Sequence, residues 1–537
     1  MNISDDSSKL VFTIDQVRNI LGDSNQSKYI FRYLDKWGAS TCVVEKRYID
    51  KDYIIDYSKF YARSFKEYDK FTTRLHFFSE AFSDDVFENA LIKGDEIFFE
   101  KLRKSYLGFV VKKPIENSIG DPLIGRTILK KYPADDNKEN EDLFHISDKY
   151  NVSLFGIPLE IDSLPFQPQD RAVGACATAA CWTALHPLNT LFGVQKYSPF
   201  EVTEKSVSFP SLEERNFPST GLTLLQMKSY FNSINLETEF IDIEKIKKLK
   251  DYTSKDDIVI DAVRAFTGMG LPVIAALILF TDEFLFGWDE IPGNDNRRLI
   301  EFLIRNFGIN WVEFAEIAKT DDNRSIKLSY ENNFLSLKLN NEISKVELKI
   351  NESTIAEFHT KIEYGKVNIY KKNLHGKHAA VISGYNQEEG IIKELYIHDD
   401  QIGPYSRVLP VGNFTQWRNE WTELYGCSDV LVYKLMVPIY PKIRMSFISV
   451  YQGFLKKKRK LEKRQEGLIP QLYLMQVKKY KKFLLKKTFN NKIDILKRPF
   501  PRFVWIIRLL FRNTPTQDYI YDGTSVYLKE KSIDFKN

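Results

Sequence analysis

The feature that most constrains the fold of this chain is an alanine-rich run, GACATAACWTAL (Gly174–Leu185), whose interior contains no helix breaker. Alanine has the highest helix propensity, so the run predicts a helix that begins near Cys176. Later in the chain, HAAVISGY (His378–Tyr385) and IIKELYIHDD (Ile391–Asp400) predict two adjacent strands joined by a turn. We therefore expect an α+β fold in which this helix packs on an antiparallel sheet.

The chain of 537 residues is too long for one ordinary core, and its local patterns change along its length. Residues 1–105 are predicted to form a mainly helical N-terminal region, in which aromatic residues recur at helical spacing over Tyr57–Phe82. Residues 106–437 are predicted to form a central domain with an insertion at about 282–372. Residues 438–537 are predicted to form a basic C-terminal α/β extension, with prolines at its start.

Shorter patterns predict further elements. YLGFVVKKP (Tyr106–Pro114) and LIGRTILKKY (Leu123–Tyr132) predict a β-hairpin, and LPVIAALILF (Leu271–Phe280) predicts a buried strand. Thr223 is predicted to cap a helix that follows it. Apolar and polar residues alternate over Leu328–Glu352, which predicts an exposed antiparallel hairpin within the insertion.

The cysteine content and the N-terminus bear on the cellular compartment. There are four cysteines, Cys42, Cys176, Cys181 and Cys427, far fewer than a secreted disulfide scaffold would use. The N-terminus, MNISDDSSKLVFTIDQV, has acids where a signal peptide needs bases. The most apolar stretch is about half the length needed to cross a bilayer. We expect a cytoplasmic protein in a reducing compartment, without a membrane span.

Charge is unevenly distributed. From Pro441 onward there are 24 Lys and Arg against 7 Asp and Glu, a net charge of about +17, which leaves about −12 for the preceding residues. This asymmetry indicates a separate C-terminal module or an intramolecular electrostatic dock. LKKKRKLEKRQEG (Leu455–Gly467) and QVKKYKKFLLKK (Gln476–Lys487) are predicted lysine-rich helices. They present either a solvated face or a contact surface for nucleic acid, anionic lipid or an acidic partner.

Three separated positions form the candidate site. A helix N-terminus, where Cys176 is expected, presents free N–H groups and partial positive charge, which lower a thiol pKa and stabilise an oxyanion. His378 begins a predicted strand, and Asp399, with Asp400 beside it, stands at the end of the next. A histidine that activates a thiol needs an orienting partner on its other nitrogen, and a neighbouring strand can supply one.

These motifs resemble those of the papain-like cysteine peptidases. The order of a glutamine, a cysteine opening a helix, HAAVISGY and Asp-x-x-x-Gly (Asp399–Gly403) is most similar to the double-glycine leader peptidases and their bacterial relatives. GLTLLQM (Gly221–Met227) and GLPVIAAL (Gly270–Leu277) also resemble elements of that group. The similarity covers roughly residues 150–437, interrupted by the insertion. Asp400 stands where the group usually has proline.

The resemblance implies a papain-like fold and a role for each residue. Cys176 would be the nucleophile, His378 its base, Asp399 the orienting partner of the imidazole, and Gln169 an oxyanion donor. The expected reaction is hydrolysis of a peptide or isopeptide bond in a peptide or protein substrate, through an acyl-enzyme. Two rivals remain: an amine acyltransferase with the same triad, and an inactive papain-like binding module whose basic C-terminal region engages a polyanion.

Two residues compete for these roles. Cys181-Trp182 matches the Cys-Trp pair around the papain nucleophile, so Cys181 is a rival for Cys176. Gln169 lies seven residues before Cys176, close to the six-residue separation of the family, although Gln167 is nearby. Cys181 would lie inside the helix, away from its N-terminus, and Cys176 is therefore preferred.

No metal or cofactor is expected. His375 and His398 lie near His378 in the sequence, but no spacing of cysteines or carboxylates matches a zinc motif. GMGLP, which starts at Gly268, lacks the lysine and the strand–turn–helix setting of a phosphate-binding loop.

Overall fold

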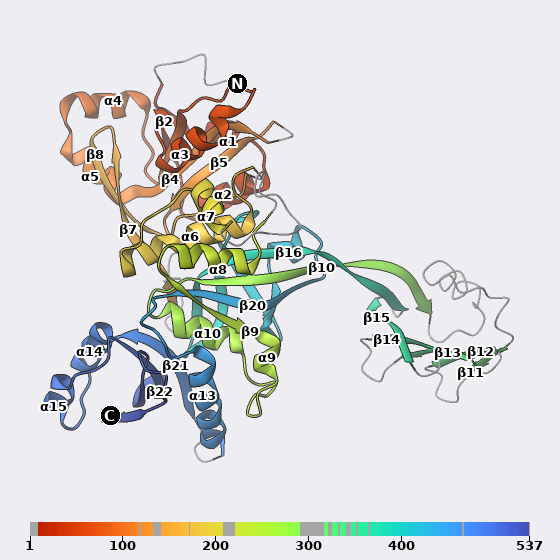
Figure 1. Cartoon of the computed structure of the whole chain (residues 1–537). Helices are drawn as coiled ribbons and strands as arrows, with labels where there is room; N and C mark the ends of the chain where they lie inside the picture. The colour runs from red at the N-terminus through yellow and green to blue at the C-terminus, as the bar shows by residue number, and fades with distance from the viewer. Residues whose placement is uncertain are drawn as a thin grey trace. The chain divides into compact units, whose positions relative to one another are not determined.

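A computed structural model describes residues 9–117, 120–132, 141–170, 172–207, 221–289, 316–319, 325–330, 333–339, 345–350, 353–363, 366–463 and 467–535. The fold is of mixed α+β type with antiparallel sheets, as the sequence predicts (Figure 1). The chain divides into two compact units. Unit 1 comprises Met1–Leu277, Lys377–Glu420 and Leu431–Asn537, and unit 2 comprises Ile278–Gly376 and Trp421–Val430.

The N-terminal part of unit 1 contains a five-stranded sheet in the order β1-β2-β3-β4-β5, with strands β1 (Val11–Thr13), β2 (Thr41–Tyr48), β3 (Thr72–Phe78), β4 (Tyr106–Glu116) and β5 (Pro122–Leu129). The helices are α1 (Ile14–Leu21), α2 (Asn25–Asp35), α3 (Lys51–Lys59), α4 (Asp84–Lys93) and α5 (Glu96–Ser105), with a 3₁₀ turn η2 (Tyr61–Arg63) after α3. Each α-helix begins after a side-chain cap: Thr13, Ser24, Asp50, Ser83 and Asp95.

This sheet refines the predicted organisation in two ways. It extends across the predicted boundary at residue 105, because β3, before the boundary, pairs with β4, after it. In this pairing His76 lies opposite Phe109. The prediction of helix over Tyr57–Phe82 is wrong for Thr72–Phe78, which forms strand β3. Its side chains are buried nearly throughout, so it lacks the polar alternation by which a half-buried strand is recognised. The predicted hairpin is confirmed, since β4 and β5 pair antiparallel.

Helix α6 (Cys176–Phe192) begins at the predicted residue, continues through Pro187 and ends at Gly193, whose φ of 72° is left-handed. It is followed by α7 (Pro199–Ser206), α8 (Leu224–Ser233), α9 (Ile243–Lys247) and α10 (Ile258–Thr267). The predicted cap is confirmed, because Thr223 forms a capping box with Gln226 at the start of α8.

The main sheet has the strand order β10-β20-β19-β18-β17-β16, in which β9 also pairs with β20, and β6 and β10 also pair with β16. These strands are β6 (Glu141–His145), β9 (Glu237–Asp242), β10 (Val273–Asp289), β16 (Lys366–Glu388), β17 (Ile391–Asp399), β18 (Gly403–Val411), β19 (Asn413–Arg418) and β20 (Asp429–Ile439). A separate hairpin consists of β7 (Asp148–Leu154) and β8 (Ile157–Ser163). The predicted pair is confirmed as β16 and β17, with Val381 opposite His398, and α6 packs on β17.

Unit 2 contains successive antiparallel strands. They are β11 (Glu316–Lys319), β12 (Ser325–Tyr330), β13 (Asn333–Leu339), β14 (Lys345–Ile350) and β15 (Ser353–Glu363), followed by the first part of β16. The predicted hairpin corresponds to β13 and β14, in which Leu337 pairs with Leu348. The predicted buried strand is β10 (Val273–Asp289), whose residues from Val273 to Leu277 are buried in unit 1. Helix α12 (Glu420–Glu423) lies between β19 and β20 in the sequence.

The C-terminal residues of unit 1 form a four-stranded sheet in the order β21-β22-β23-β24. Its elements are α13 (Phe447–Glu462), β21 (Leu468–Gln476), α14 (Val477–Leu485), α15 (Lys492–Lys497), β22 (Phe503–Phe511), β23 (Thr514–Asp522) and β24 (Glu530–Asp534). Strand β22 is buried at every residue but the last, and α13 and α14 are the helices that the two lysine-rich runs predict. Tyr480 and Leu484 of α14 pack with Val504 and Ile506 of β22 in a core of their own.

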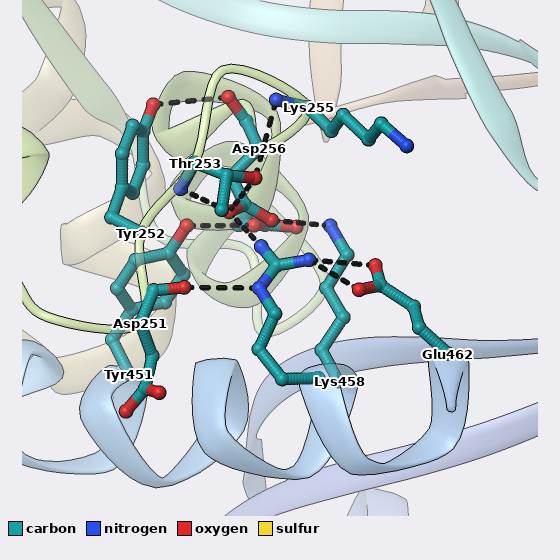
Figure 2. A network of polar contacts seen from close by, with 10 residues as sticks. Asp251, Tyr252, Thr253, Lys255, Asp256, Tyr451, Lys458 and Glu462 are labelled. Atoms are coloured by element: carbon teal, nitrogen blue, oxygen red, sulfur yellow. Dashed lines mark hydrogen bonds and ion pairs between the residues drawn. The ribbon is translucent and has the colours of Figure 1, made fainter. Parts of the chain in front are cut away.

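A polar network joins α13 to the segment before α10 (Figure 2). The Asp256 carboxylate is fully buried and pairs with Lys458, whose Nζ lies 2.7 Å away, and with Arg459. Tyr451 donates to Asp261 at 2.9 Å. Burial, the largest single influence, acts to raise the pKa of Asp256, but the hydrogen bonds from Lys458, Thr253 and Arg459 and the charge of Lys458 together outweigh it, and the pKa is lowered. Acidic residues that precede the C-terminal region therefore bind the first lysine-rich segment, which lies mostly in α13. This contact corresponds to the intramolecular electrostatic dock, one of the two alternatives that the charge asymmetry indicates.

Among the helices that the structure describes, none is both long and apolar enough to span a membrane.

Candidate functional site

Cys176 is the first residue of α6. The preceding residue, Ala175, is extended, and no side chain caps this end of the helix. The N–H groups of the first helical turn have no partners within the helix and carry partial positive charge. Cys176 is only partly buried, whereas most of the helix that follows is buried. The thiol therefore stands where a polarised carbonyl could meet both a sulfur atom and backbone donors.

His378 and Asp399 form a buried pair on adjacent strands. His378 lies on β16 and Asp399 ends β17, and the antiparallel pairing of these strands brings the two side chains together. His378 Nε2 is 2.9 Å from Asp399 Oδ2 and 3.6 Å from Asp400 Oδ1. The other oxygen of Asp399 accepts from the N–H of Gln401 at 3.0 Å. The carboxylate is therefore held on both oxygens and fixes the plane of the imidazole.

The Cys176 thiol neighbours the same imidazole closely enough to raise its pKa through hydrogen bonding. Because Nε2 faces Asp399, Nδ1 is the nitrogen left for the sulfur. Burial, the largest single influence, acts to lower the pKa of His378, but the charge and hydrogen bond of Asp399, together with Cys176 and Asp400, outweigh burial. The pKa of His378 is therefore well above its ordinary value, and the site favours an imidazolium beside the sulfur.

The loop before Cys176 is organised by Asp170. Its Oδ1 accepts from three consecutive backbone N–H groups, those of residues 172, 173 and 174, at 2.9 to 3.1 Å. Its backbone N–H also donates to the carbonyl of Gly174. Tyr61 donates to Asp170 Oδ2 at 3.1 Å, and Lys113 Nζ lies 3.5 Å from the same oxygen. One buried carboxylate thus closes the turn that leads into the helix.

Elements of the N-terminal region supply much of this support. Lys113 lies on β4, Tyr61 follows α3, and α3 itself carries two buried acids. Asp52 accepts from Trp182 of α6 at 3.2 Å, and Asp56 accepts from the N–H of Phe200 in α7 at 3.1 Å. Burial raises the pKa of Asp52 to about 6 and that of Asp56 to about 8. The N-terminal region is therefore in direct contact with the nucleophile helix and its neighbour.

Cys181, the rival nucleophile, lies within α6 and is fully buried. Burial raises the pKa of its thiol, with a smaller contribution from the charge of Cys176. A buried thiol away from the helix N-terminus is a poor nucleophile. This geometry favours Cys176, whose catalytic role stays a prediction.

The structure brings Cys176, His378 and Asp399 together but does not include Gln169 in that group. Gln169 is half-buried, and among the described residues no hydrogen bond joins its side chain to Cys176 or His378. Gln167 is buried, and its Oε1 has no hydrogen-bond partner among the described residues. Which of the two glutamines would face an oxyanion stays open.

The described residues contain one group whose atoms could ligate a metal ion, namely His378, Asp399 and Asp400, with ligand atoms within 4.8 Å of one another. This group is the candidate site itself, and its imidazole already bonds the Asp399 carboxylate. His398 is outside the group, because its ring packs against Tyr405 and Phe166.

The sequence analysis did not identify the residues that hold the loop before Cys176. Asp170 adjoins Gln169 in QPQDRAVGAC, and an aspartate followed by residues that turn toward a glycine is a signal for a turn closed by its side chain. Lys113 carries no such signal, because its partner lies 57 residues away and only the tertiary structure joins them.

Comparisons with protein-family models, with curated proteins and with solved structures found no match. The geometry of the site is therefore the basis for a function.

Proposed function

We propose that the protein is a cysteine-nucleophile hydrolase of the papain-like type, nearest to the bacterial double-glycine leader-peptidase group. The observation that supports this most is one imidazole that bonds the Cys176 thiol and, through Nε2, the Asp399 carboxylate. A thiol at a helix N-terminus, a base within hydrogen-bonding reach and an acceptor that orients the base are the parts of a cysteine-nucleophile triad.

In the proposed reaction the thiol proton passes to His378, and the resulting thiolate attacks the carbonyl carbon of a peptide or isopeptide bond. The carbonyl oxygen becomes an oxyanion, which the N–H groups at the start of α6 and Gln169 stabilise. The C–N bond then breaks, and the imidazolium gives its proton to the leaving amine. His378 next takes a proton from water, which attacks the thioester and releases the acid and the free thiol.

Asp399 would hold the imidazole in the orientation that presents Nδ1 to the sulfur and stabilise its protonated form. Asp400 would add negative charge at longer range, since its oxygen is 3.6 Å from the ring nitrogen. Neither carboxylate needs to accept the proton in this scheme.

The test is alkylation of the protein by a fluorescent iodoacetamide between pH 5.5 and 8, with the labelled residue mapped by mass spectrometry. A sulfur paired with an imidazolium reacts in the acidic half of this range, where an ordinary thiol is protonated. We expect Cys176→Ala to abolish the acidic labelling and Cys181→Ala to preserve it, while both variants keep the circular dichroism of the parent. Acidic labelling that depends on Cys181 would contradict the assignment.

Two further candidates use the same residues. An amine acyltransferase would pass the acyl group to an added amine instead of water, and product analysis by mass spectrometry distinguishes the two. An inactive binding module is favoured by the exposed lysines of α14, such as Lys478 and Lys482, which could engage a polyanion. That module would bind a polyanion with strong salt dependence and show no acidic labelling at any cysteine.

A cytoplasmic location is part of the same proposal. The four cysteines are all free thiols, which suits a reducing compartment. We expect the peptide or protein substrate to be met there.

A further inference from the structure

The two basic segments of the C-terminal region differ in how their charges are used. In α13, Lys458 and Arg459 pair with the buried Asp256, and Lys457 pairs with Glu530 at 3.0 Å. Each of these cations already has a carboxylate partner within the fold. The second segment, residues 477–502, contains ten Lys and Arg and one acid, Asp494. Within the part of the chain that the structure describes, none of these ten cations forms an ion pair with a carboxylate.

Helix α14 places its lysines on one exposed face. Lys478, Lys482 and Leu485 are separated by four and three residues, so they lie on the same side of the helix. Tyr480 and Leu484 lie on the opposite side and are buried against the C-terminal sheet. The helix is therefore amphipathic with a basic solvent face, and Leu485, the last residue of the helix, lies on this face and is 59% exposed.

Helix α15 extends this face. Figure 1 shows α14 and α15 side by side. Lys481 donates to the carbonyl of Leu496 at 2.7 Å, and Lys492 donates to the carbonyl of Leu485 at 2.7 Å. Ile493, the residue after Lys492, is 67% exposed. Leu485 and Ile493 are thus both exposed, and the two helices that carry them are joined by the hydrogen bond from Lys492 to the Leu485 carbonyl.

We propose that this face, defined by Lys478, Lys482, Leu485, Lys486 and Ile493, binds the surface of an anionic phospholipid membrane. Lysines near such a surface are attracted to its lipid headgroups, and exposed aliphatic side chains enter the boundary between headgroups and acyl chains. The face has no exposed aromatic side chain on which bases could stack, and a phosphate backbone would gain nothing from Leu485 and Ile493. The lipid surface uses both the charge and the apolar residues. This inference does not depend on the proposed hydrolase chemistry.

The test is co-sedimentation of the full chain with sucrose-loaded vesicles, of pure phosphatidylcholine or of phosphatidylcholine with 30% phosphatidylglycerol. We expect binding to the anionic vesicles alone, with affinity that falls as salt rises from 50 to 300 mM. The variant K478E/K482E/K486E should bind at least tenfold more weakly. The variant L485S/I493S should bind several-fold more weakly at unchanged net charge.

A matched control carries the same change of charge on the other helix. Lys456, Lys460 and Lys463 are exposed lysines of the α13 segment, and K456E/K460E/K463E should keep the parental affinity within about threefold. Thermal melts check that every variant folds like the parent. Equal losses in the two triple variants would overturn the proposal, because net charge and not this face would then be responsible. Absence of binding to anionic vesicles, or binding of duplex DNA in its place, would overturn it as well.

Discussion

Two buried histidines of unit 1 have nearly the same partners but opposite properties. His378 Nε2 lies 2.9 Å from Asp399, and His76 Nε2 lies 2.9 Å from Glu45. Each ring also contacts a third side chain, the Cys176 thiol in one case and the Tyr106 hydroxyl, 2.9 Å from Nδ1, in the other. Yet the pKa of His378 is well above its ordinary value, whereas that of His76 is lowered to about 4.

The difference lies in the surrounding charge and in access. Burial acts to lower both pKa values, but Glu45 is shared with Arg74, whose charge further disfavours an imidazolium at His76. His378 instead faces two carboxylates, Asp399 and Asp400. Tyr106 is buried in the N-terminal core, whereas Cys176 is partly exposed at a helix end. A buried histidine that contacts an acid and a hydroxyl group therefore belongs to a structural network in the usual case. A catalytic role requires, in addition, excess negative charge around the imidazole and a nucleophile that a substrate can reach.

The largest expected effect separates the roles of the two rings. His378→Ala should reduce the rate of acidic alkylation, or of peptide hydrolysis where a substrate is found, by about 10² to 10⁴-fold, because it removes the base. His76→Ala should leave that rate within about threefold and instead lower the thermal melting temperature. Equal losses of activity in the two variants would show that the distinction is wrong.

The carboxylates that bond the two histidines, Asp399 and Glu45, should also differ in their effect on activity. Asp399→Asn keeps the shape of the side chain but removes its charge, so we expect the pKa of His378 to fall and the rate to drop by about 10²-fold or more at neutral pH. Titration of the histidine ring protons by NMR measures the pKa. Glu45→Gln is the matched control and should leave both the rate and the His378 resonance unchanged.

The two rings should also give stability slopes of opposite sign. His76 has a pKa of about 4 in the fold and about 6.5 when unfolded, so only the unfolded chain takes up this proton between those values. The free energy of unfolding therefore falls as pH falls through this window. We expect His76→Gln to remove about 2 to 3 kcal/mol of the difference in the free energy of unfolding between pH 7 and pH 4.5, measured by urea denaturation.

His378 contributes to the pH dependence of the free energy of unfolding with the opposite sign. Its pKa is raised in the fold, so its stabilisation is fully present below about pH 6.5, the value of the unfolded chain, and is lost as pH rises through the folded value. His378→Gln should therefore flatten the decline of stability on the alkaline side. A pH profile that both glutamine variants change in the same direction would contradict this account.

The smallest effect is expected at Asp400. Its oxygen lies 3.6 Å from the ring, and its charge is the last of the named influences on the pKa of His378. Asp400→Asn should lower that pKa by less than Asp399→Asn does and should reduce the rate by less than tenfold. A larger loss than in Asp399→Asn would assign the orienting role to Asp400.

Local sequence was sufficient where the signal is local. The start of α6 at Cys176, the cap at Thr223, and the pair β16–β17 follow from alanine content, a Thr-x-x-Gln box and runs of β-branched residues. The relation between His378 and Asp399 was also predictable, because the two residues lie on adjacent antiparallel strands. The predicted strand start at His378 was wrong, since β16 already begins at Lys366 and His378 lies within it. The use of both residues in catalysis stays a prediction.

Residues joined by distant contacts were not predictable in this way. Lys113 with Asp170, and Asp52 with Trp182, are separated by 57 and 130 positions, and each pairing exists because whole elements pack together. The strand Thr72–Phe78 was obscured because burial on nearly every residue removes the alternation that identifies strands. The His76–Glu45 network is likewise visible only after β2 and β3 have paired.

The anchoring of Asp170 by Lys113 and Tyr61 bears on how this chain can be shortened. A fragment that begins after β5 would keep every member of the triad but leave a buried carboxylate without its cation and its hydroxyl donor. The turn before Cys176 would then lose its anchor, and the exposed faces of α6 and α7 would have no cover. The smallest piece able to hold the sulfur beside its imidazole therefore begins near the first strand, about 160 residues ahead of the nucleophile.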